Sequence, residues 1–229
     1  INTDALAGAE KRMLQMFYVT VWGKAAESWQ DEEVLGHLHD LAHSPILLEE
    51  FQELLQLRFD AIDFLDQPVE LGFDCPLDVH CTYTMKQIVT ALDYYNFSAM
   101  AGVGVRYFPD KKVDVFFVTL NKSDKEYSPT TMYHDYSINE NLFHWQSQST
   151  TSETSPTGQR YIHHRQRGSK ILLFVRETKN DLVGAAPYTF LGTANYVKHE
   201  GSRPMSITWK LDVPIPAKYL RKTNKLVVG

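Results

Sequence analysis

The feature of this sequence that most constrains its fold is a strict alternation of apolar and polar residues between positions 205 and 213. The apolar members of the alternation are Met205, Ile207, Trp209, Leu211 and Val213. Because successive side chains of a strand point to opposite faces of a sheet, the pattern predicts a strand buried on one face only. Further strands are predicted at Val113–Leu120, Lys170–Arg176 and Pro187–Gly192. Strands separated by long polar loops predict a curved antiparallel sheet or a small barrel.

The N-terminal part of the chain carries helical patterns instead. Apolar residues recur at helical spacing over residues 6–22, and Ser28 is a predicted N-cap for a second helix that ends near Ala42. A third helix is predicted after Ser44, with Pro45 at its first position, where the missing N–H costs nothing. The third helix has an apolar stripe, which we expect to face either the other helices or a preceding domain. The stripe consists of Leu47, Leu48, Phe51, Leu54, Leu55, Arg58 and Phe59.

A predicted linker separates the two kinds of pattern. The segment Gln67–Asp78 contains two prolines and a glycine, which favours a connection rather than a helix or strand. A capping box at Thr84 then predicts a short helix that ends near Asp93. The sequence therefore predicts an α+β chain, with a helical coupling segment at residues 1–70 and a strand-rich domain at residues 71–229.

Charge is distributed unevenly along the chain. The formal net charge is −5, but residues 1–80 hold 4 Lys/Arg against 16 Asp/Glu, and residues 151–229 hold 13 against 5. An acidic front and a basic back indicate two functional regions, the second suited to nucleic acid. The alternative is that both are ordinary solvated surfaces.

The composition indicates what class of protein this is and where in the cell we expect it. It is 43% hydrophobic and 22% charged, which is typical of globular domains. Its apolar runs fall far short of the ~20 residues that cross a membrane, and no signal-peptide pattern opens it. Because it begins with Ile1, we expect a fragment of a longer protein. With only two cysteines, we expect that protein to be cytoplasmic.

Metal binding and common catalytic motifs are not predicted. Cys75 and Cys81, with His80 between them, supply three ligands at the wrong spacing, whereas a structural zinc site needs four. Reduced thiols are the expected state of both cysteines. The chain has no P-loop, GxSxG, HExxH or protein-kinase signature.

Two neighbouring stretches place aromatic rings beside polar, mostly uncharged groups. In the stretch 141–151, Phe143, His144 and Trp145 precede two glutamines and several hydroxyl residues. Such a segment can recognise a planar polar group, for example a nucleobase. In Thr130–Ser137, two tyrosines flank Asp135, whose carboxylate could accept a hydrogen bond from the cytosine amine. The alternative for Asp135 is an ordinary surface turn.

Two charged patterns follow. The stretch Pro156–Lys170 is basic and, beside an aromatic and amide-rich segment, favours contacts with DNA phosphates. The alternative is a basic hairpin that only confers solubility. Glu177 and Lys179 follow a strand and, with Asp110 or Asp114 upstream, could form a metal-dependent nuclease site. The alternative for that pair is a salt bridge at a strand end.

Several long stretches resemble a known domain. They are "DVFFVTLNKSDKEYSPTTMYHDYSINENLFHWQSQSTT", "SPTGQRYIHHRQRGSKILLFVRE", "APYTFLG" and "HEGSRPMSITWKL". In this order they are similar to DUF3427, a domain at the C-terminus of bacterial superfamily 2 helicases, many of which carry an N-terminal phospholipase-D-like nuclease domain. The resemblance covers about Leu77 to Ala217. The preceding helices resemble the segment that links the helicase core to this domain.

The resemblance implies a role in modification-dependent, type IV restriction of DNA that contains 5-methylcytosine or 5-hydroxymethylcytosine. It implies an SRA-like fold, related to PUA-type barrels, in the target-recognition part of an ATP-dependent enzyme from the bacterial cytoplasm. ATP and Mg would serve the helicase of the parent protein, and this fragment is expected to need no cofactor or metal and to bind without cutting. The expected partners are double-stranded DNA with a modified cytosine, the preceding helicase domain and a second copy of the chain, with no membrane.

A reader of this kind flips the cytosine out of the duplex and holds it between rings and hydrogen-bonding groups. The predicted base pocket consists of Tyr107, Tyr133, Asp135, Tyr136, Trp145, Gln146 and Gln148. The predicted contacts to the DNA backbone are Lys122, Arg160, Arg165, Arg167 and Lys170. Three alternatives stay open: DNA binding without modification specificity, a protein-interaction module built on the acidic helices, and a nuclease that uses Glu177 and Lys179.

Overall fold

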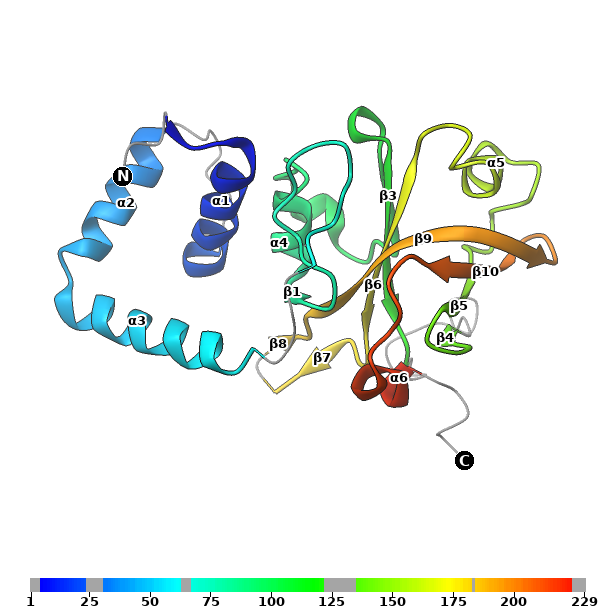
Figure 1. Cartoon of the computed structure of the whole chain (residues 1–229). Helices are drawn as coiled ribbons and strands as arrows, with labels where there is room; N and C mark the ends of the chain where they lie inside the picture. The colour runs from blue at the N-terminus through cyan, green and yellow to red at the C-terminus, as the bar shows by residue number, and fades with distance from the viewer. Residues whose placement is uncertain (1–4, 24–30, 63–66, 122–134, 183, 224–229) are drawn as a thin grey trace. The chain divides into compact units, whose positions relative to one another are not determined.

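A computed structural model describes residues 5–23, 31–62, 67–121, 135–182 and 184–223 (Figure 1). The chain forms two compact units. The first unit comprises residues 1–76 and 86–97, and the second comprises residues 77–85 and 98–229. Each unit is described by itself below.

The first unit is helical, as the sequence predicts. It contains α1 (Gly8–Trp22), α2 (Asp31–Ala42), α3 (Pro45–Asp60) and α4 (Met85–Thr90). Pro45 occupies the first turn of α3, and Ser44 precedes it without a capping hydrogen bond from its side chain. The predicted cap Ser28 lies outside the described residues.

The core of the first unit is small and aromatic. Tyr18 and Val34 are buried, and the rings of Tyr18, Trp22 and His37 stack on one another at centroid distances of 4.8 to 5.6 Å. The guanidinium of Arg12 donates two hydrogen bonds to Asp93, at 2.8 and 2.9 Å, which tie α1 to the segment after α4. None of the residues of α3 is buried.

The second unit is built on an eight-stranded sheet. Its path runs β2 (Val105–Phe108), β3 (Val113–Thr119), β6 (Lys170–Arg176), β9 (Tyr188–Glu200), β10 (Ser206–Leu211), β5 (Leu142–Gln146) and β4 (Tyr136–Ser137), with β1 (Thr82–Tyr83) paired to β9. A separate hairpin joins β7 (Asn180–Asp181) to β8 (Gly184–Ala185). Two short helices, α5 (Pro156–Ile162) and α6 (Ala217–Thr223), complete the unit, with 3₁₀ turns at Ser98–Met100 and Pro109–Lys111.

The predicted antiparallel sheet is wrong in one pair. Strands β3 and β6 run parallel, with Val113 opposite Lys170 and Thr119 opposite Arg176, whereas the other pairs of the described sheet are antiparallel. A parallel pair needs a long crossover connection, and the chain between β3 and β6 supplies one that includes β4, β5 and α5. The sheet is therefore mixed, and among the described strands the edges β2 and β4 do not pair to close a barrel.

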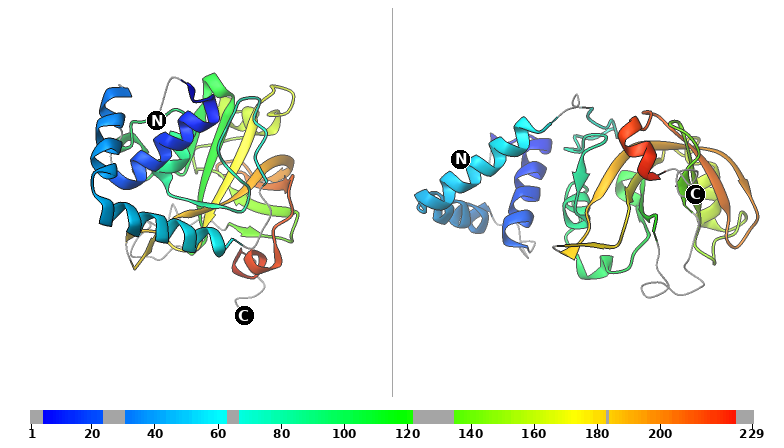
Figure 2. Two further views of the ribbon diagram at one scale, coloured as in Figure 1. Left: turned by 60° about the vertical axis from the view of Figure 1, so that its left-hand side comes forward. Right: turned by 90° about the horizontal axis from the view of Figure 1, so that it is seen from below.

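The sheet is nevertheless strongly curved. Phe116 of β3 stacks on Trp145 of β5 with ring centroids 4.2 Å apart, although β6, β9 and β10 lie between those strands in the sheet. Figure 2 shows the strands of this unit bending around a common interior. Side chains from distant strands therefore meet on the concave face.

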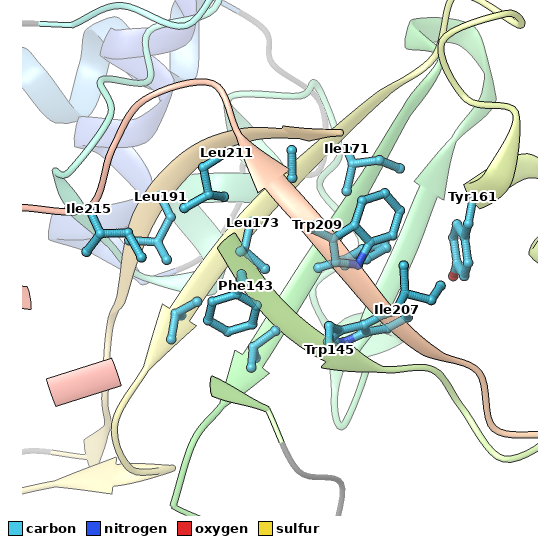
Figure 3. Packing of buried hydrophobic residues seen from close by; sticks show 14 of the residues in the cluster. Phe143, Trp145, Tyr161, Ile171, Leu173, Leu191, Ile207, Trp209, Leu211 and Ile215 are labelled. Carbon is cyan, nitrogen blue, oxygen red and sulfur yellow. The ribbon is translucent and has the colours of Figure 1, made fainter. Parts of the chain in front are cut away.

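That concave face holds the main hydrophobic core (Figure 3). Trp209 lies at its centre and is fully buried. Its ring contacts those of Phe116, Tyr161 and Tyr196 edge-on, at centroid distances of 5.5 to 6.3 Å. Pairs of this kind stabilise a core by ~0.5–1.5 kcal/mol each beyond the burial of their area.

The alternation that predicted β10 is confirmed in part, because Thr208, on the opposite face of the strand, is also buried. Met205, Ile207, Trp209 and Leu211 are at most 2% exposed, whereas Lys210 is exposed. Strand β9 is longer than predicted, because the chain continues as a strand through Gly192, where φ is +91°. A Cβ at Gly192 would lie 3.3 Å from a methyl group of Val79, so only glycine fits this close approach without strain.

Candidate DNA-binding surface and cavity

Trp145 does not lie on a surface where a base could reach it, which corrects its predicted role. Its side chain is 5% exposed, and one face of the indole stacks on Phe116 while Tyr161 meets it edge-on at 5.6 Å. The reason is its position on β5, where Phe143 and Trp145 point into the concave core and His144 and Gln146 point away. Trp145 is a core residue of the second unit.

Arg160, a predicted phosphate contact, is engaged in a buried ion pair with Asp114 and in a contact with the Tyr107 ring. The guanidinium donates from Nε to Oδ2 of Asp114 at 2.8 Å and from Nη2 to Oδ1 at 2.9 Å, and the carboxylate is fully buried. The same guanidinium lies 4.1 Å from the ring centroid of Tyr107, and so covers a ring face predicted to stack on a base. Burial raises the pKa of Asp114, against the opposing effect of the hydrogen bonds from Arg160.

The buried ion pair has a signal in the sequence that the analysis above did not use. Asp114 is the one polar residue between Val113 and Val118, inside a strand buried along its whole length. A carboxylate in such a run needs a partner, because an unpaired buried charge is very costly. Arg160, on α5, is that partner.

The chain after α5 forms a basic turn, which we define as residues 163–170. His164 anchors this turn, because its side chain is buried and both ring nitrogens form hydrogen bonds. Nδ1 donates to the carbonyl of Ser169 at 3.1 Å, and Nε2 accepts the Tyr196 N–H at 3.1 Å. Burial lowers the pKa of His164, so the neutral ring that both bonds require is the favoured form.

The cations of the basic turn point away from this anchor. Arg165 donates from Nε to Oδ1 of Asn195 at 2.7 Å, which fixes the guanidinium at the surface. Arg167 and Lys170 are exposed, and neither side chain has a hydrogen bond or an ion pair among the described residues. The carbonyl of Lys112 accepts hydrogen bonds from the Lys170 N–H and the Ser169 hydroxyl, which hold Lys112 next to the basic turn. Lys112 is exposed there.

The other predicted base-pocket residues lie on the edge formed by β4 and β5. Tyr136 stacks on His144 with centroids 4.8 Å apart and planes 16° apart. Asp135 is 9% exposed, and its Oδ1 accepts the Gln146 N–H at 2.9 Å, which fixes the carboxylate against β5. Gln148 is exposed. The predicted residues Tyr133 and Lys122 lie outside the described part of the chain.

A cavity of about 350 Å³ lies elsewhere in the second unit. It opens at the carboxyl ends of β3 and β6, where Leu120 and Glu177 follow the strands, and α6 contributes Tyr219 and Thr223 to its lining. None of the predicted base-pocket residues that the structure describes lines this cavity. Serine 137 of β4 reaches it indirectly, because its hydroxyl donates to that of Thr223 at 2.6 Å.

The structure separates the residues of the alternative nuclease site. Asp114 pairs in register with Ile171 at the start of β6, whereas Glu177 follows the end of that strand. At about 3.3 Å per residue the two carboxylates are about 20 Å apart, too far to share a metal ion. Among the described residues, no three His, Cys, Asp or Glu side chains cluster as metal ligands.

Two further observations bear on the sequence predictions. Cys75 is buried, Cys81 is partly buried, and both are free thiols. In the part of the chain that the structure describes, no helix combines the length and apolarity that a membrane span requires.

The fold and surface together define an α+β module whose curved mixed sheet carries an exposed basic turn at one end and a cavity at the other. The chain belongs to the family described as a domain of unknown function, DUF3427, whose model matches residues 77–222. The expected family membership is confirmed, and the match begins at Leu77, where the second compact unit also begins. No curated protein matches the chain.

Proposed function

We propose that this domain binds double-stranded DNA and reads a modified cytosine, 5-methylcytosine or 5-hydroxymethylcytosine, as the target-recognition part of an ATP-dependent type IV restriction enzyme. The base is read after it has been flipped out of the duplex in the manner of SRA-like readers. The fragment itself binds without cutting, and ATP and Mg serve the helicase part of the parent protein in the bacterial cytoplasm. The proposal rests on the family resemblance and on the chemistry of the second unit.

The observation that carries the proposal is the contrast between paired and open cations. Arg160 donates from Nε and Nη2 to the buried Asp114 carboxylate, whereas Arg167 and Lys170 are exposed on the basic turn without an acidic partner among the described residues. Open cations held on a rigid anchor suit the phosphate backbone, which dominates the affinity of DNA-binding proteins. The excess of basic residues over acidic ones in residues 151–229 adds to the positive potential that attracts DNA.

Reading the base requires an acceptor and a stacking surface. Asp135 supports this role because its carboxylate is fixed by the Gln146 N–H, and a carboxylate can accept from the cytosine amine. Tyr136, Gln146 and Gln148 remain predicted pocket residues, and Trp145 supports them from the core. Flipping costs a few kcal/mol, and stacking returns about 1–3 kcal/mol per base.

Preference for the modification is expected to be modest. Burial of one methyl group contributes about 0.8 kcal/mol, which is roughly fourfold in affinity. A hydrophobic pocket rarely separates such ligands by more than about 1–3 kcal/mol. The chain should therefore bind unmodified DNA measurably, and a later ATP-dependent step in the parent enzyme would sharpen the choice.

The test is equilibrium binding of the chain to matched duplexes that carry cytosine, 5-methylcytosine or 5-hydroxymethylcytosine at one site. We expect binding to all three, weaker at higher salt, with a severalfold preference for a modified duplex. Absence of binding to any duplex at low salt would refute the proposal. A preference above a thousandfold would contradict the account of selectivity by simple burial of a methyl group.

A second candidate function, coupling to another protein, is favoured by one observation on α3. The side chains of Ile46, Leu54 and Phe59 are between 55% and 79% exposed, and the acidic Glu49, Glu50 and Glu53 lie on the same helix. An exposed apolar patch of this kind marks an interaction site more often than a bare surface. Light scattering across a range of chain concentrations tests one form of this function, in which α3 pairs with α3 of a second copy.

A further inference from the structure

The cavity at the carboxyl ends of β3 and β6 has the size and lining of a small-ligand site. Its volume of about 350 Å³ is near the lower end of the range of ligand pockets, about 300–1,000 Å³. It therefore suits one small ring system rather than a dinucleotide. Its residues come from five segments of the second unit, which are the end of β3, the end of β6, the β7–β8 hairpin, β9 and α6.

Part of the cavity lining is apolar. Leu120, Val175 and Leu191 contribute aliphatic side chains, and Val175 and Leu191 are also members of the buried core. The ring of Tyr219, on α6, is partly exposed and contributes a flat surface to the lining. A planar ring with a small apolar substituent would bury that substituent against the aliphatic side chains.

Most polar groups that line the cavity are already engaged. Arg176 donates from Nε to the Thr119 hydroxyl at 3.0 Å and from Nη1 to the Ala186 carbonyl at 3.1 Å, and it lies over the ring of Tyr188. Glu177 and Thr189 differ. In the described part of the chain, neither side chain has a hydrogen-bond partner. An acceptor carboxylate and a hydroxyl thus remain for a ligand.

The surroundings narrow the class of ligand. Lys179 and Lys218 are exposed neighbours of the lining residues Thr178 and Tyr219, so a free amine would meet like charges there. A neutral ring that carries an amino group could donate to Glu177, and a phosphate attached to the ring would be attracted by the positive charge of the two lysines. A cytosine nucleotide is such a ligand, and its C5 substituent would face the aliphatic side chains.

We infer that this cavity receives the flipped cytosine, with the Glu177 carboxylate as acceptor of the exocyclic amine and the Leu191 side chain as the contact for the C5 substituent. The inference rests on the proposed function and moves the base from the β4–β5 edge to the far end of β6. The nucleotide is taken from DNA, and a free nucleotide is the competing source of the same chemistry.

The test uses the whole chain and duplexes in which the target lies opposite an abasic site, so that no base pair has to be broken. The target is 5-methylcytosine or thymine, which both carry the C5 methyl group and differ at the amine. A neighbouring 2-aminopurine reports unstacking by its fluorescence. The variants are Glu177→Ala and Thr189→Phe, with Glu140→Ala as a matched control, because Glu140 is an exposed carboxylate of the same unit away from the cavity.

We expect the parent chain to prefer 5-methylcytosine over thymine by about tenfold, as one hydrogen-bonded base contact allows. Glu177→Ala should abolish this preference, and Thr189→Phe should abolish the rise in fluorescence by filling the cavity. Glu140→Ala should change neither. Because Glu177 is exposed, Glu177→Ala should fold as the parent does, and circular dichroism verifies this.

The outcomes separate this inference from the proposed function. If the parent binds no duplex, the proposed function fails. If the parent binds and prefers 5-methylcytosine, and Glu177→Ala and Thr189→Phe behave like Glu140→Ala, the cavity inference alone is overturned. Loss of the preference in Asp135→Asn but not in Glu177→Ala overturns it as well and returns the base to the β4–β5 edge. Tighter binding of free 5-methyl-dCMP than of the duplex overturns DNA as the source.

Discussion

The two compact units of this chain differ in how completely they bury their apolar residues. In the second unit, rings from β3, β5 and β10 meet on the concave face of one sheet and are almost completely buried. In the first unit, α3 has 16 residues, and none of them is buried. A unit with its own core can present a rigid polar surface, whereas a helix with an exposed apolar face is suited to contact another protein.

The charges differ in the same sense between two stretches of the chain, one of which lies almost entirely in the first unit and the other in the second. Residues 1–80 carry 16 acidic and 4 basic side chains, and residues 151–229 carry 5 and 13. An acidic helical unit repels DNA, and a basic sheet unit attracts it. The comparison therefore assigns DNA to the second unit and protein contact to the first, and the following changes test that assignment in order of expected effect.

The largest effect is expected from Trp145→Ala. Truncation of a buried Trp costs about 3–5 kcal/mol of unfolding free energy, and Trp145 packs between Phe116 and Tyr161. Urea unfolding measures the loss. His144→Ala, on the outward face of the same strand, is the control and should cost much less. A Trp145→Ala chain that keeps its stability but loses DNA binding would return Trp145 to the surface.

Arg160→Ala is expected to cost slightly less. The change leaves the Asp114 carboxylate buried without its partner, and the loss of one member of a buried ion pair typically costs about 3–5 kcal/mol. The loss of unfolding free energy should be near the lower end of this range, because the Arg160 side chain keeps partial contact with water. Thermal unfolding measures it, and unchanged stability would contradict the structural role of the pair.

Lys170→Ala should affect DNA binding and not stability. Its side chain is exposed and has no partner among the described residues, so its removal leaves the fold intact. The plot of log K against log salt has a negative slope, and each lost phosphate contact makes that slope shallower by about 0.9 for duplex DNA. Binding isotherms at several salt concentrations measure the slope. Arg58→Ala, which removes an exposed cation of the first unit, should leave the slope unchanged.

Mild acid should destabilise the second unit through His164. Its folded pKa lies below its ordinary value of 6.5 because the ring is buried, so the unfolded chain binds the proton more readily. The stability contribution of the neutral ring is present above pH 6.5 and is lost as pH falls below it. Protonation would also turn Nε2 into a donor facing the Tyr196 N–H.

The measurement is the unfolding free energy of the parent chain and of His164→Gln between pH 7 and pH 5. The parent should lose more stability over this interval than the variant. Part of the loss should persist in the variant, because burial and Lys218 lower the pKa of His80 as well. Equal losses in the two chains would show that His164 does not titrate in this window.

The smallest effect on stability is expected on α3. Leu54→Ser changes a side chain that is 55% exposed, and surface substitutions usually stay within about 0.5 kcal/mol. Val19→Ser, in the buried face of α1, is the control and should destabilise clearly. If Leu54→Ser destabilises as much as Val19→Ser, α3 packs within its own unit and the comparison between the units fails.

Much of the fold follows from local patterns in the sequence. The alternation at 205–213 and the apolar run at 170–176 predict β10 and β6 closely, because a pleated strand imposes a period of two on buried residues. The parallel pairing of β3 with β6 does not follow, because pairing partners are chosen by contacts between residues far apart in the chain. The sequence does not predict the second half of β9, because the residues after Tyr196 are largely exposed and show no apolar pattern.

The candidate site was harder to predict than the fold. A run such as "LFHWQ" gives no sign of which ring enters the core, and the alternation along β5 sends Trp145 inward and His144 outward. Asp114 carried a readable signal, since a carboxylate in an apolar strand demands a partner. The cavity beside Glu177 carried none, because its lining comes from five separate segments that only the folded chain brings together.

The most direct test of the central claim is a crystal structure of the chain bound to a duplex with a single 5-methylcytosine. The account predicts that this cytosine lies outside the helix and inside the second unit, with phosphates near Arg167 and Lys170. A complex in which every base stays paired, or in which the DNA contacts only the first unit, would contradict it.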